Sequence, residues 1–325
     1  MWRTFLRELN AEVVVSEPTN YELITQGASR VVSDTCLPLK VFIGHVHSLV
    51  NKCDFMLIPI LRSNKKKVLN CSRFLGLPDV TRAVVPDAPP ILEIEFDMDR
   101  GRSYLYRQIL NLGRHFTPNP LKIKNAAYSA WEMHRKYQEM TADLKITHNE
   151  ATSIIEGSKN KTGTSKNFSR FDESKLLNIG LIGHAYVLDD ETVNHRIQIL
   201  LEKFGVRLIT PEMLTSEQLL QGMRNMIPDT YWVSEDEVVG AGGSYLEGVI
   251  DGIIGVMAFG CGPDSLMMHI VQRKARSKNV PFMCLTLDEH TAEAGIITRL
   301  EAFTDMIRLR SARRNADAGY VPSYR

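Results

Sequence analysis

Cysteine is scarce in this sequence, and no two cysteines form a closely spaced pair. The 325 residues contain five cysteines, whereas secreted disulfide scaffolds carry a dense and even-numbered set. No segment reaches the roughly 18 uninterrupted apolar residues that a membrane-spanning helix needs. The start, MWRTFLRELN, lacks the apolar core and small-residue cleavage site of an export signal. We therefore predict a reduced, cytoplasmic protein that is neither exported nor membrane-spanning.

An excess of one charge sign is also missing. The formal net charge is +1, and no basic stripe interleaved with aromatic residues stands out, which argues against a dedicated nucleic-acid binder. The composition, 44% hydrophobic and 24% charged residues, is typical of a globular protein. A chain of this length favours about two domains.

Short apolar strands alternate with helical patterns in two parts of the chain, which is typical of parallel α/β architecture. We predict an α/β fold of two Rossmann-like parallel-sheet domains with a helical insertion between them. No strand precedes the first helix, so we expect the N-terminal domain to lack its first strand. The predicted parts are an N-terminal α/β domain (1–100), a helical arm with a polar connection (101–175), a C-terminal α/β domain (176–312) and a flexible tail (313–325).

The apolar runs also predict individual elements. In the N-terminal domain we expect strands at 12–15, 54–60 and 91–96. In the C-terminal domain we expect strands at 178–182, 206–209, 251–257 and 281–286, and helices at 191–204, 215–225, 235–247, 264–278 and 293–310. The polar stretch 147–175 is predicted to be a loop, and the chain beyond Arg310 to be frayed.

Cys261 lies where an open α/β sheet builds its site. The strand 251–257 runs into Gly260-Cys261-Gly262-Pro263, after which a helical pattern begins. Parallel sheets bind ligands at the carboxyl ends of their strands, and a thiol at a helix N-terminus has a lowered pKa that favours metal binding. The same pattern also suits a strand-to-helix turn that holds a buried thiol.

Cys36 and Cys71 stand in similar surroundings, Thr35-Cys36-Leu37-Pro38 before a helical pattern and Asn70-Cys71-Ser72-Arg73 in a loop. Three thiolates on separate loops suit a cubane iron–sulfur cluster. Structural zinc more often shows close Cys-x-x-Cys pairs, which are absent. We interpret the other two cysteines, Cys53 and Cys284, as packing residues.

Together these motifs resemble a known family. They are TCLPLKVFIGHV (35–46), Cys71 with FLGLPD (74–79), IGHAY (182–186), FGCGPDS (259–265), LDEHTAEAG (287–295) and TRLEAF (298–303). The set is similar to the acyl-CoA dehydratase activase-related proteins, which are related to 2-hydroxyacyl-CoA dehydratase subunits and to double-cubane cluster proteins. The resemblance covers nearly the whole chain, although family members tend to have Cys-Pro-Lys where this chain has Cys71-Ser72-Arg73.

The resemblance implies that Cys36, Cys71 and Cys261 hold a [4Fe-4S] cluster, or a double-cubane cluster, between two α/β domains. In the dehydratase relatives, an ATP-hydrolysing activator charges such a cluster, which passes one electron to an acyl-CoA and permits radical elimination of water. The activator is a separate ATPase whose phosphate loop this chain lacks. Gly240-Ala-Gly-Gly-Ser244 is the nearest similar run, and we interpret it as a turn or helix interruption.

We therefore predict an iron–sulfur protein acting in low-potential electron transfer or in radical or reductive chemistry on an acyl-CoA or other small substrate. As an enzyme it would be a dehydratase-like lyase component or a cluster-dependent reductase, but the sequence assigns no catalytic residue. The alternatives are a non-catalytic electron-transfer or interaction subunit and a cluster-free α/β small-molecule-binding protein. Expected partners are a second copy or a companion cluster-binding subunit, an ATP-dependent activator and an acyl-CoA.

Further residues are candidates for the cluster loops or a pocket beside them. Glu289 and His290 follow the strand 281–286 at the sheet end where Cys261 lies, with helix capping as the alternative interpretation. The cysteine loops themselves add Pro38, Gly260, Gly262 and Ser265. We interpret His45, His47 and His184 as loop or helix-surface residues, with a fourth cluster ligand as the alternative.

Overall fold

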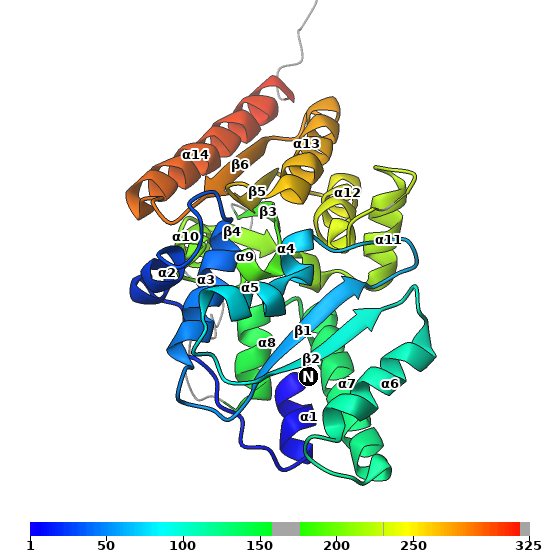
Figure 1. Cartoon of the computed structure of the whole chain (residues 1–325). Helices are drawn as coiled ribbons and strands as arrows, with labels where there is room; N and C mark the ends of the chain where they lie inside the picture. Colours follow the sequence, from blue (N-terminus) through cyan, green and yellow to red (C-terminus); the bar gives the residue numbers. More distant parts are fainter. Residues whose placement is uncertain (158–175, 230, 319–325) are drawn as a thin grey trace, which may run out of the picture.

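Two parallel β-sheets with helices packed around them form the structure (Figure 1). The computed structural model describes residues 1–157, 176–229 and 231–318. Within these ranges one sheet has two strands and the other has four. This confirms the predicted α/β fold of two Rossmann-like units. None of the helices in the described ranges combines the length and apolar character that crossing a bilayer requires.

The smaller sheet pairs β1 (Met56–Ser63) with β2 (Ile91–Asp97) in parallel, so that Met56 lies opposite Ile91. A parallel pair needs a crossover between its strands, and two short helices supply it. The helices of this unit are α1 (Trp2–Glu8), α2 (Tyr21–Ala28), α3 (Leu37–Ser48), α4 (Ser72–Leu75) and α5 (Leu77–Val84). Apolar side chains of α3, including Ile43, pack against β1.

Helices α2 and α3 cross at two glycines. A Cβ at Gly27 would lie 1.8 Å from the carbonyl oxygen of Lys40, and one at Gly44 would lie 2.1 Å from that of Leu23. Only glycine permits this approach of two backbones. The crossing fixes the start of α3, which directly follows Cys36.

The segment 11–20 is irregular, so the predicted strand 12–15 is wrong. The side chains of Val14 and Val15 are exposed, and among the described residues the two strands of the small sheet pair only with each other. The segment instead reaches the other unit, where the hydroxyl of Thr192 donates to the carbonyl of Thr19 at 2.7 Å. Tertiary contacts therefore outweigh the β propensity of the valines.

Three helices form the predicted arm: α6 (Arg102–Gly113), α7 (Pro120–Leu144) and α8 (His148–Ile155). The side chain of Asn119 caps α7, whose first residue is Pro120. Helix α8 corrects our expectation of a loop from residue 147 onward. Its start is stabilised by a capping box between Thr147 and Glu150, a local signal that the polar composition concealed. The rest of that predicted loop, residues 158–175, lies outside the described ranges.

The larger sheet has the strand order β4-β3-β5-β6, all parallel. Because β4 and β5 lie on opposite sides of β3, the chain changes direction across the sheet at β3, and the carboxyl ends of β3 and β5 flank the crevice where such folds bind ligands. The strands are β3 (Leu177–Ile182), β4 (Val206–Ile209), β5 (Gly252–Ala258) and β6 (Phe282–Leu287).

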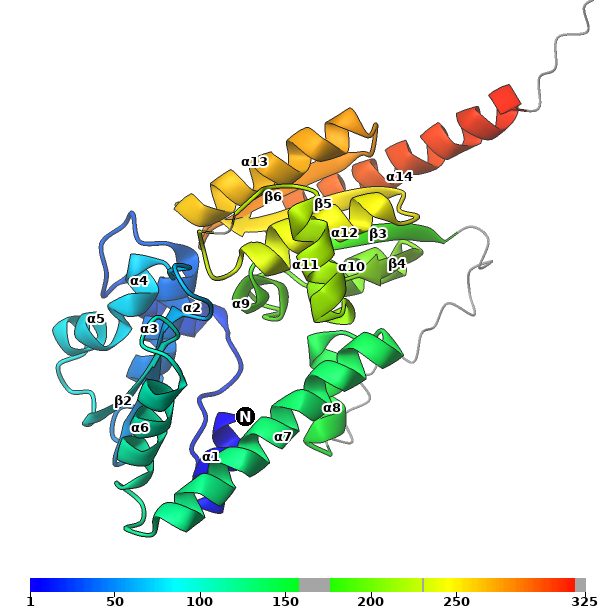
Figure 2. The ribbon, with the colours of Figure 1, turned by 90° about the vertical axis from the view of Figure 1, so that its right-hand side faces the viewer.

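Helices cover both faces of this sheet (Figure 2). On one face α10 (Ile197–Lys203) and α14 (Glu293–Ala318) pack on the strands, and Ile24, Leu37 and Val41 from α2 and α3 join the same core. The N-terminal unit is thus docked on the second sheet by buried apolar contacts. The other face packs against η4 (Asp236–Gly240), α12 (Ala241–Glu247), α13 (Gly262–Ser277) and part of α11 (Ser216–Arg224). Two short elements, α9 (Ala185–Leu188) and η3 (Pro211–Met213), complete the unit.

Two predicted helix ends differ from the structure. Helix α10 starts at Ile197 instead of residue 191, because His195 and Arg196 adopt left-handed backbone angles, φ 52° and 58°, that a right-handed helix cannot contain. Helix α14 continues to Ala318, beyond the Arg310 where we expected fraying. Alanine and arginine, frequent in 311–318, are strong helix formers.

Candidate metal centre

Cys261 lies at the carboxyl end of β5, beside the point where the chain changes direction across the sheet. The strand ends at Ala258, and Gly260 has φ +76°, a left-handed angle that turns the chain and favours glycine. Cys261 is the N-cap residue of α13 and makes no side-chain capping bond. The Cys261 side chain therefore does not cap the helix that it precedes.

The other two predicted ligands occupy the same kind of position. Cys36 is the N-cap of α3 and Cys71 is the N-cap of α4, and neither thiol makes a capping hydrogen bond. All three cysteines thus precede the N-terminus of a helix, but the pKa of Cys261 is raised by burial and not lowered as we predicted. All three are free and partly accessible.

The electrostatics of Tyr186, on α9, bring the three thiols into one neighbourhood. Burial is the main cause that raises the pKa of Tyr186, and the negative charges of Asp264, Cys261, Cys36 and Cys71 raise it further. Burial also raises the pKa of Cys261 to about 12, with added repulsion from Asp264 and Cys36. The charges of thiols from both units therefore act on one side chain, although among the described residues only Cys261 of the three belongs to a group of ligand atoms within 4.8 Å of one another.

Arg73 stands among these thiols. A hydrogen bond from its guanidinium to the Cys36 sulfur raises the pKa of Arg73, and the charges of Cys71 and Asp34 add to the effect. Its Nη2 lies 3.4 Å from the carbonyl oxygen of Asp34, while Nη1 is buried without a hydrogen-bond partner. The Arg73 guanidinium thus offers a positive charge and an unpaired N–H donor close to the thiols. Both suit a site that concentrates negative charge.

His184, Cys261 and Asp264 offer three potential metal ligands within 4.8 Å of one another. Nε2 of His184 lies 3.0 Å from Oδ1 of Asp264, yet the geometry is not that of a hydrogen bond. Both oxygens of Asp264 and Nδ1 of His184 are buried without partners. Buried polar atoms nearly always have a hydrogen-bond partner. Here the buried nitrogen and oxygen atoms lack one and are of the types that bind metal ions, so the group is a candidate metal site.

Burial suppresses the charge of both side chains. It raises the pKa of Asp264 to about 7, although the neighbouring Cys261 thiol acts in the opposite direction. It lowers the pKa of His184 to about 4. A neutral imidazole is the form that binds a metal, and a bound cation repays the cost of burying a carboxylate. His184 lies in the loop between β3 and α9, as one of our two interpretations had it, but it is buried, and its ring stacks on that of Tyr186 at 4.8 Å between centroids.

Aromatic rings connect the two units at this point. Phe74, next to Arg73 on α4, lies 5.2 Å from Tyr186 between ring centroids, and Tyr186 stacks on His184. The row of three rings runs from the Cys71 loop to the histidine beside Cys261. It places aromatic surface between the two cysteine loops.

The predicted residues of the cysteine loops lie at helix starts. Pro38 is in the first turn of α3 and Gly262 begins α13. The hydroxyl of Ser265 donates to the carbonyl of Cys261 at 2.8 Å. A Cβ added to Gly260 would lie 3.8 Å from the carbonyl of Asp34, so this turn approaches the loop before Cys36. Their roles toward a ligand stay predictions.

The two candidates after β6 differ from each other. Oε1 of Glu289 lies 2.5 Å from Nζ of Lys40 on α3, so this carboxylate is engaged across the unit boundary. His290 is exposed, with Nε2 3.7 Å from the same oxygen. The turn around them is closed by Asp288, which accepts from the His290 backbone N–H and the Thr291 hydroxyl. A contact of either residue with a ligand stays a prediction.

The remaining sequence candidates lie elsewhere. Gly240 and Gly243 belong to the helical segment η4–α12, where their neighbours are backbone atoms of α11, so the run is an interrupted helix as predicted. Cys53 packs in the small-sheet core. Cys284 lies on β6 as predicted, but it is exposed instead of packed, because it faces outward from the edge strand of the sheet.

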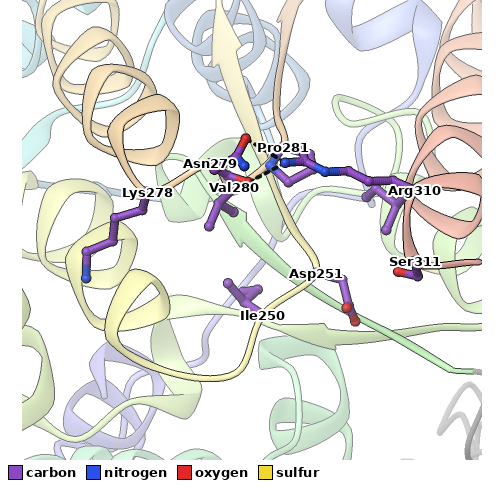
Figure 3. A pocket seen from close by; sticks show the side chains of 9 residues that line it. Ile250, Asp251, Lys278, Asn279, Val280, Pro281, Arg310 and Ser311 are labelled. Carbon is purple, nitrogen blue, oxygen red and sulfur yellow. Dashed lines mark hydrogen bonds between the residues drawn. The ribbon is translucent and has the colours of Figure 1, made fainter. Parts of the chain in front are cut away.

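A pocket of ≈ 110 Å³ lies at the opposite ends of the strands (Figure 3). Residues before β5 and β6, such as Asp251 and Pro281, line it together with Arg310. Arg310 is bonded to Asn279, and Asp251 accepts from the backbone of Asn178, so these polar groups are already paired. The volume is well below the roughly 300 Å³ of a small-molecule site.

Sequence reasoning missed Asp264, Arg73 and Tyr186. One signal was present: Cys261-Gly-Pro-Asp264 has the spacing of a Cys-x-x-Cys ligand pair with a carboxylate in the second place. The role of Tyr186 had no local signal, because it depends on thiols from two other loops.

The comparison with known proteins assigns a family. No curated protein matches this chain. A family model described as the CoA enzyme activase uncharacterised domain matches residues 1–214, a segment that contains Cys36, Cys71 and His184. Because the match spans well over half of the 325 residues, this chain belongs to the CoA enzyme activase uncharacterised domain family.

Proposed function

We propose that this protein binds an iron–sulfur cluster through Cys36, Cys71 and Cys261 and acts in low-potential electron transfer or reductive chemistry on an acyl-CoA or another small substrate. One observation carries the proposal. Three free thiols from separate loops, each preceding a helix, all lie close enough to Tyr186 to influence its charge.

The donor set fits a cluster of several irons. Soft thiolates select iron–sulfur clusters, copper(I) or zinc. The three cysteines are far apart in sequence, whereas structural zinc sites usually draw ligands from closely spaced pairs. Separate loops suit the larger volume of a cubane, each of whose irons takes its own ligand. A double-cubane cluster, in which one sulfide bridges two cubanes, leaves six irons that need a ligand, so it would take these three thiolates from each of two copies of the chain.

The surroundings support redox use. Hydrogen bonds to the sulfurs, nearby charge and solvent exposure set the reduction potential of a bound cluster. Arg73 provides a donor and a positive charge, and the rings of Phe74 and Tyr186 pack against each other beside it. When bound, the cluster supplies one-electron chemistry. The chain's own groups hold it at the boundary between two units, where a partner protein can dock.

Family membership supports the choice of substrate and partner. The name of the family links it to enzymes of CoA substrates. We therefore propose an acyl-CoA as the substrate class and an ATP-dependent activator as the electron donor, with a second copy or a companion subunit as a further partner.

The first experiment measures iron and acid-labile sulfide after anaerobic purification and reconstitution. We expect about four irons and four sulfides per chain for one cubane, and an EPR signal after reduction. Cys36→Ser, Cys71→Ser and Cys261→Ser are expected to lose most of the iron. Cys53→Ser and Cys284→Ser are matched controls, because those thiols are not among the groups that influence Tyr186, and they are expected to keep it.

Four irons per chain in a protein that is a dimer only when loaded would point to a double cubane shared by two copies. A wild-type protein that takes up no iron even on reconstitution would overturn the proposal and leave a binding module. Equal iron loss in the control variants would show that the cysteines act through folding only.

A further inference from the structure

Asp264 is a fully buried carboxyl group whose polar neighbours include the Cys261 thiol and the His184 ring. It lies in the first turn of α13, three residues after Cys261. Neither of its oxygens has a hydrogen-bond partner. An unpaired buried carboxylate is costly, and proteins tolerate one mainly where it binds a cation.

The spacing places this carboxylate beside the Cys261 sulfur. Residues three apart on a helix share a face, and Asp264 offers an oxygen within 4.8 Å of both the Cys261 thiol and the His184 ring. A Cys-x-x-Asp pair therefore presents two ligand atoms on one helical turn, as a Cys-x-x-Cys pair does.

His184 lies where it can orient the carboxylate. Its Nε2 is 3.0 Å from Oδ1 of Asp264, and the ring is held in place by stacking on Tyr186. Ligating carboxylates in metal sites are themselves held by such neighbours.

We propose that Asp264 is the fourth protein ligand of the cluster and that His184 positions its carboxylate. The proposal rests on the proposed function, since it needs the cluster held by Cys36, Cys71 and Cys261. With four protein ligands every iron of a cubane is occupied, so no iron is open to a substrate. The protein is then an electron carrier, which receives and passes on one electron without binding the acyl-CoA at iron.

Cyanide, which binds an open iron, is the probe. The reduced wild-type protein is expected to need more cyanide than Asp264→Ala for the same change in its EPR spectrum, because cyanide has to displace the carboxylate. In Asp264→Ala an iron is open, so cyanide is expected to shift the g values while the iron content stays at the wild-type level. Asp264→Cys restores a ligand and is expected to be insensitive to cyanide. Asp305→Ala removes an exposed carboxylate from α14 and serves as the control.

His184→Gln separates a positioning role from a structural one. It is expected to retain four irons but to bind cyanide in a fraction of the molecules, because the carboxylate is less firmly oriented. If this variant and Asp264→Ala do not fold, the proposal is still tested by comparing the effect of cyanide on the EPR spectra of the wild type and of Asp264→Cys.

Two results would overturn the inference. One is a wild-type cluster whose spectrum cyanide changes as much as that of Asp264→Ala. The other is a single metal ion per chain that Cys36→Ser and Cys71→Ser retain and Asp264→Ala loses, which would assign a mononuclear His-Cys-Asp site. Absence of iron from the wild type would instead contradict the proposed function, so the two failures are distinguishable.

Discussion

Lys40 and Glu289 form an ion pair that joins the two units of the molecule. Nζ of Lys40, on α3, lies 2.5 Å from Oε1 of Glu289, which follows β6. The Lys40 side chain is only 3% exposed, and it also donates to the carbonyl of Ser33 at 2.8 Å. Because Lys40 lies one turn after Cys36, the pair fixes where the Cys36 loop stands relative to the Cys261 loop.

Replacing Glu289 by Gln is expected to lower the free energy of unfolding by roughly 2–3 kcal/mol, because a buried ammonium loses its counter-charge. Chemical denaturation of the metal-free protein measures the change. Glu247→Gln is the control: Glu247 pairs with Lys278 on the surface, and such exposed pairs contribute little. Equal losses in the two variants would contradict a special role of the Lys40 pair.

The pair also predicts a pH dependence. Burial by itself acts to raise the pKa of Glu289, but the hydrogen bond from Lys40 and its charge outweigh this and hold the pKa below the ordinary 4.5. The native state therefore binds the proton less tightly than the unfolded chain. The contribution of Glu289 to stability is complete above the ordinary pKa and is lost as pH falls through the lowered one.

Denaturation of the wild type and of Glu289→Gln across pH tests this sign. The difference between their free energies of unfolding is expected to be constant well above pH 4.5 and to shrink below it. A difference that grows as pH falls would assign the effect to another group.

The strands were largely predictable from the sequence. Continuous apolar runs such as 206–209 mark strands covered on both faces, and here the prediction and β4 coincide. The placement of Cys261 followed from the same logic, because the carboxyl end of a buried strand is where a parallel sheet builds its site.

Features that depend on contacts between residues far apart in the sequence were not predictable. Ile24 and Val41 are apolar in any amphipathic helix, and nothing local tells that they pack on the second sheet. Likewise the sequence alone indicates a surface position for Lys40, because only folding brings its partner Glu289 beside it. Val14 and Val15 have the composition of a strand, but they lack a neighbouring strand to pair with in the described structure.

The glycine crossing of α2 and α3 predicts a strong effect of one methyl group. In Gly27→Ala the added Cβ would lie 1.8 Å from the Lys40 carbonyl oxygen, so the helices must separate. We expect a loss of about 3 kcal/mol in the free energy of unfolding and reduced iron uptake, because Cys36 moves with α3. In the control Gly295→Ala the Cβ meets open space on an exposed helix, and stability is expected to rise slightly. An unchanged Gly27→Ala protein would contradict this packing.

Arg73 predicts the direction in which the reduction potential of the loaded protein moves. The Cys36 sulfur and the charge of Cys71 raise the pKa of the Arg73 guanidinium, and its Nη1 has no partner within the described structure. Reduction adds one negative charge, which a nearby cation stabilises. Arg73→Gln is therefore expected to lower the midpoint potential, by about 59 mV for each tenfold loss in the ratio of reduced to oxidised protein.

An EPR-monitored redox titration of loaded wild type, Arg73→Gln and Arg107→Gln tests this prediction. Arg107 is exposed on α6, so its variant loses the same charge outside the thiol group and is expected to keep the wild-type potential. A wild-type protein labelled with ¹⁵N only in arginine is expected to show a nitrogen coupling in pulsed EPR of the reduced state. Absence of that coupling, together with equal potentials in all three proteins, would place the Arg73 guanidinium away from the cluster and restrict its role to holding the Cys36 loop.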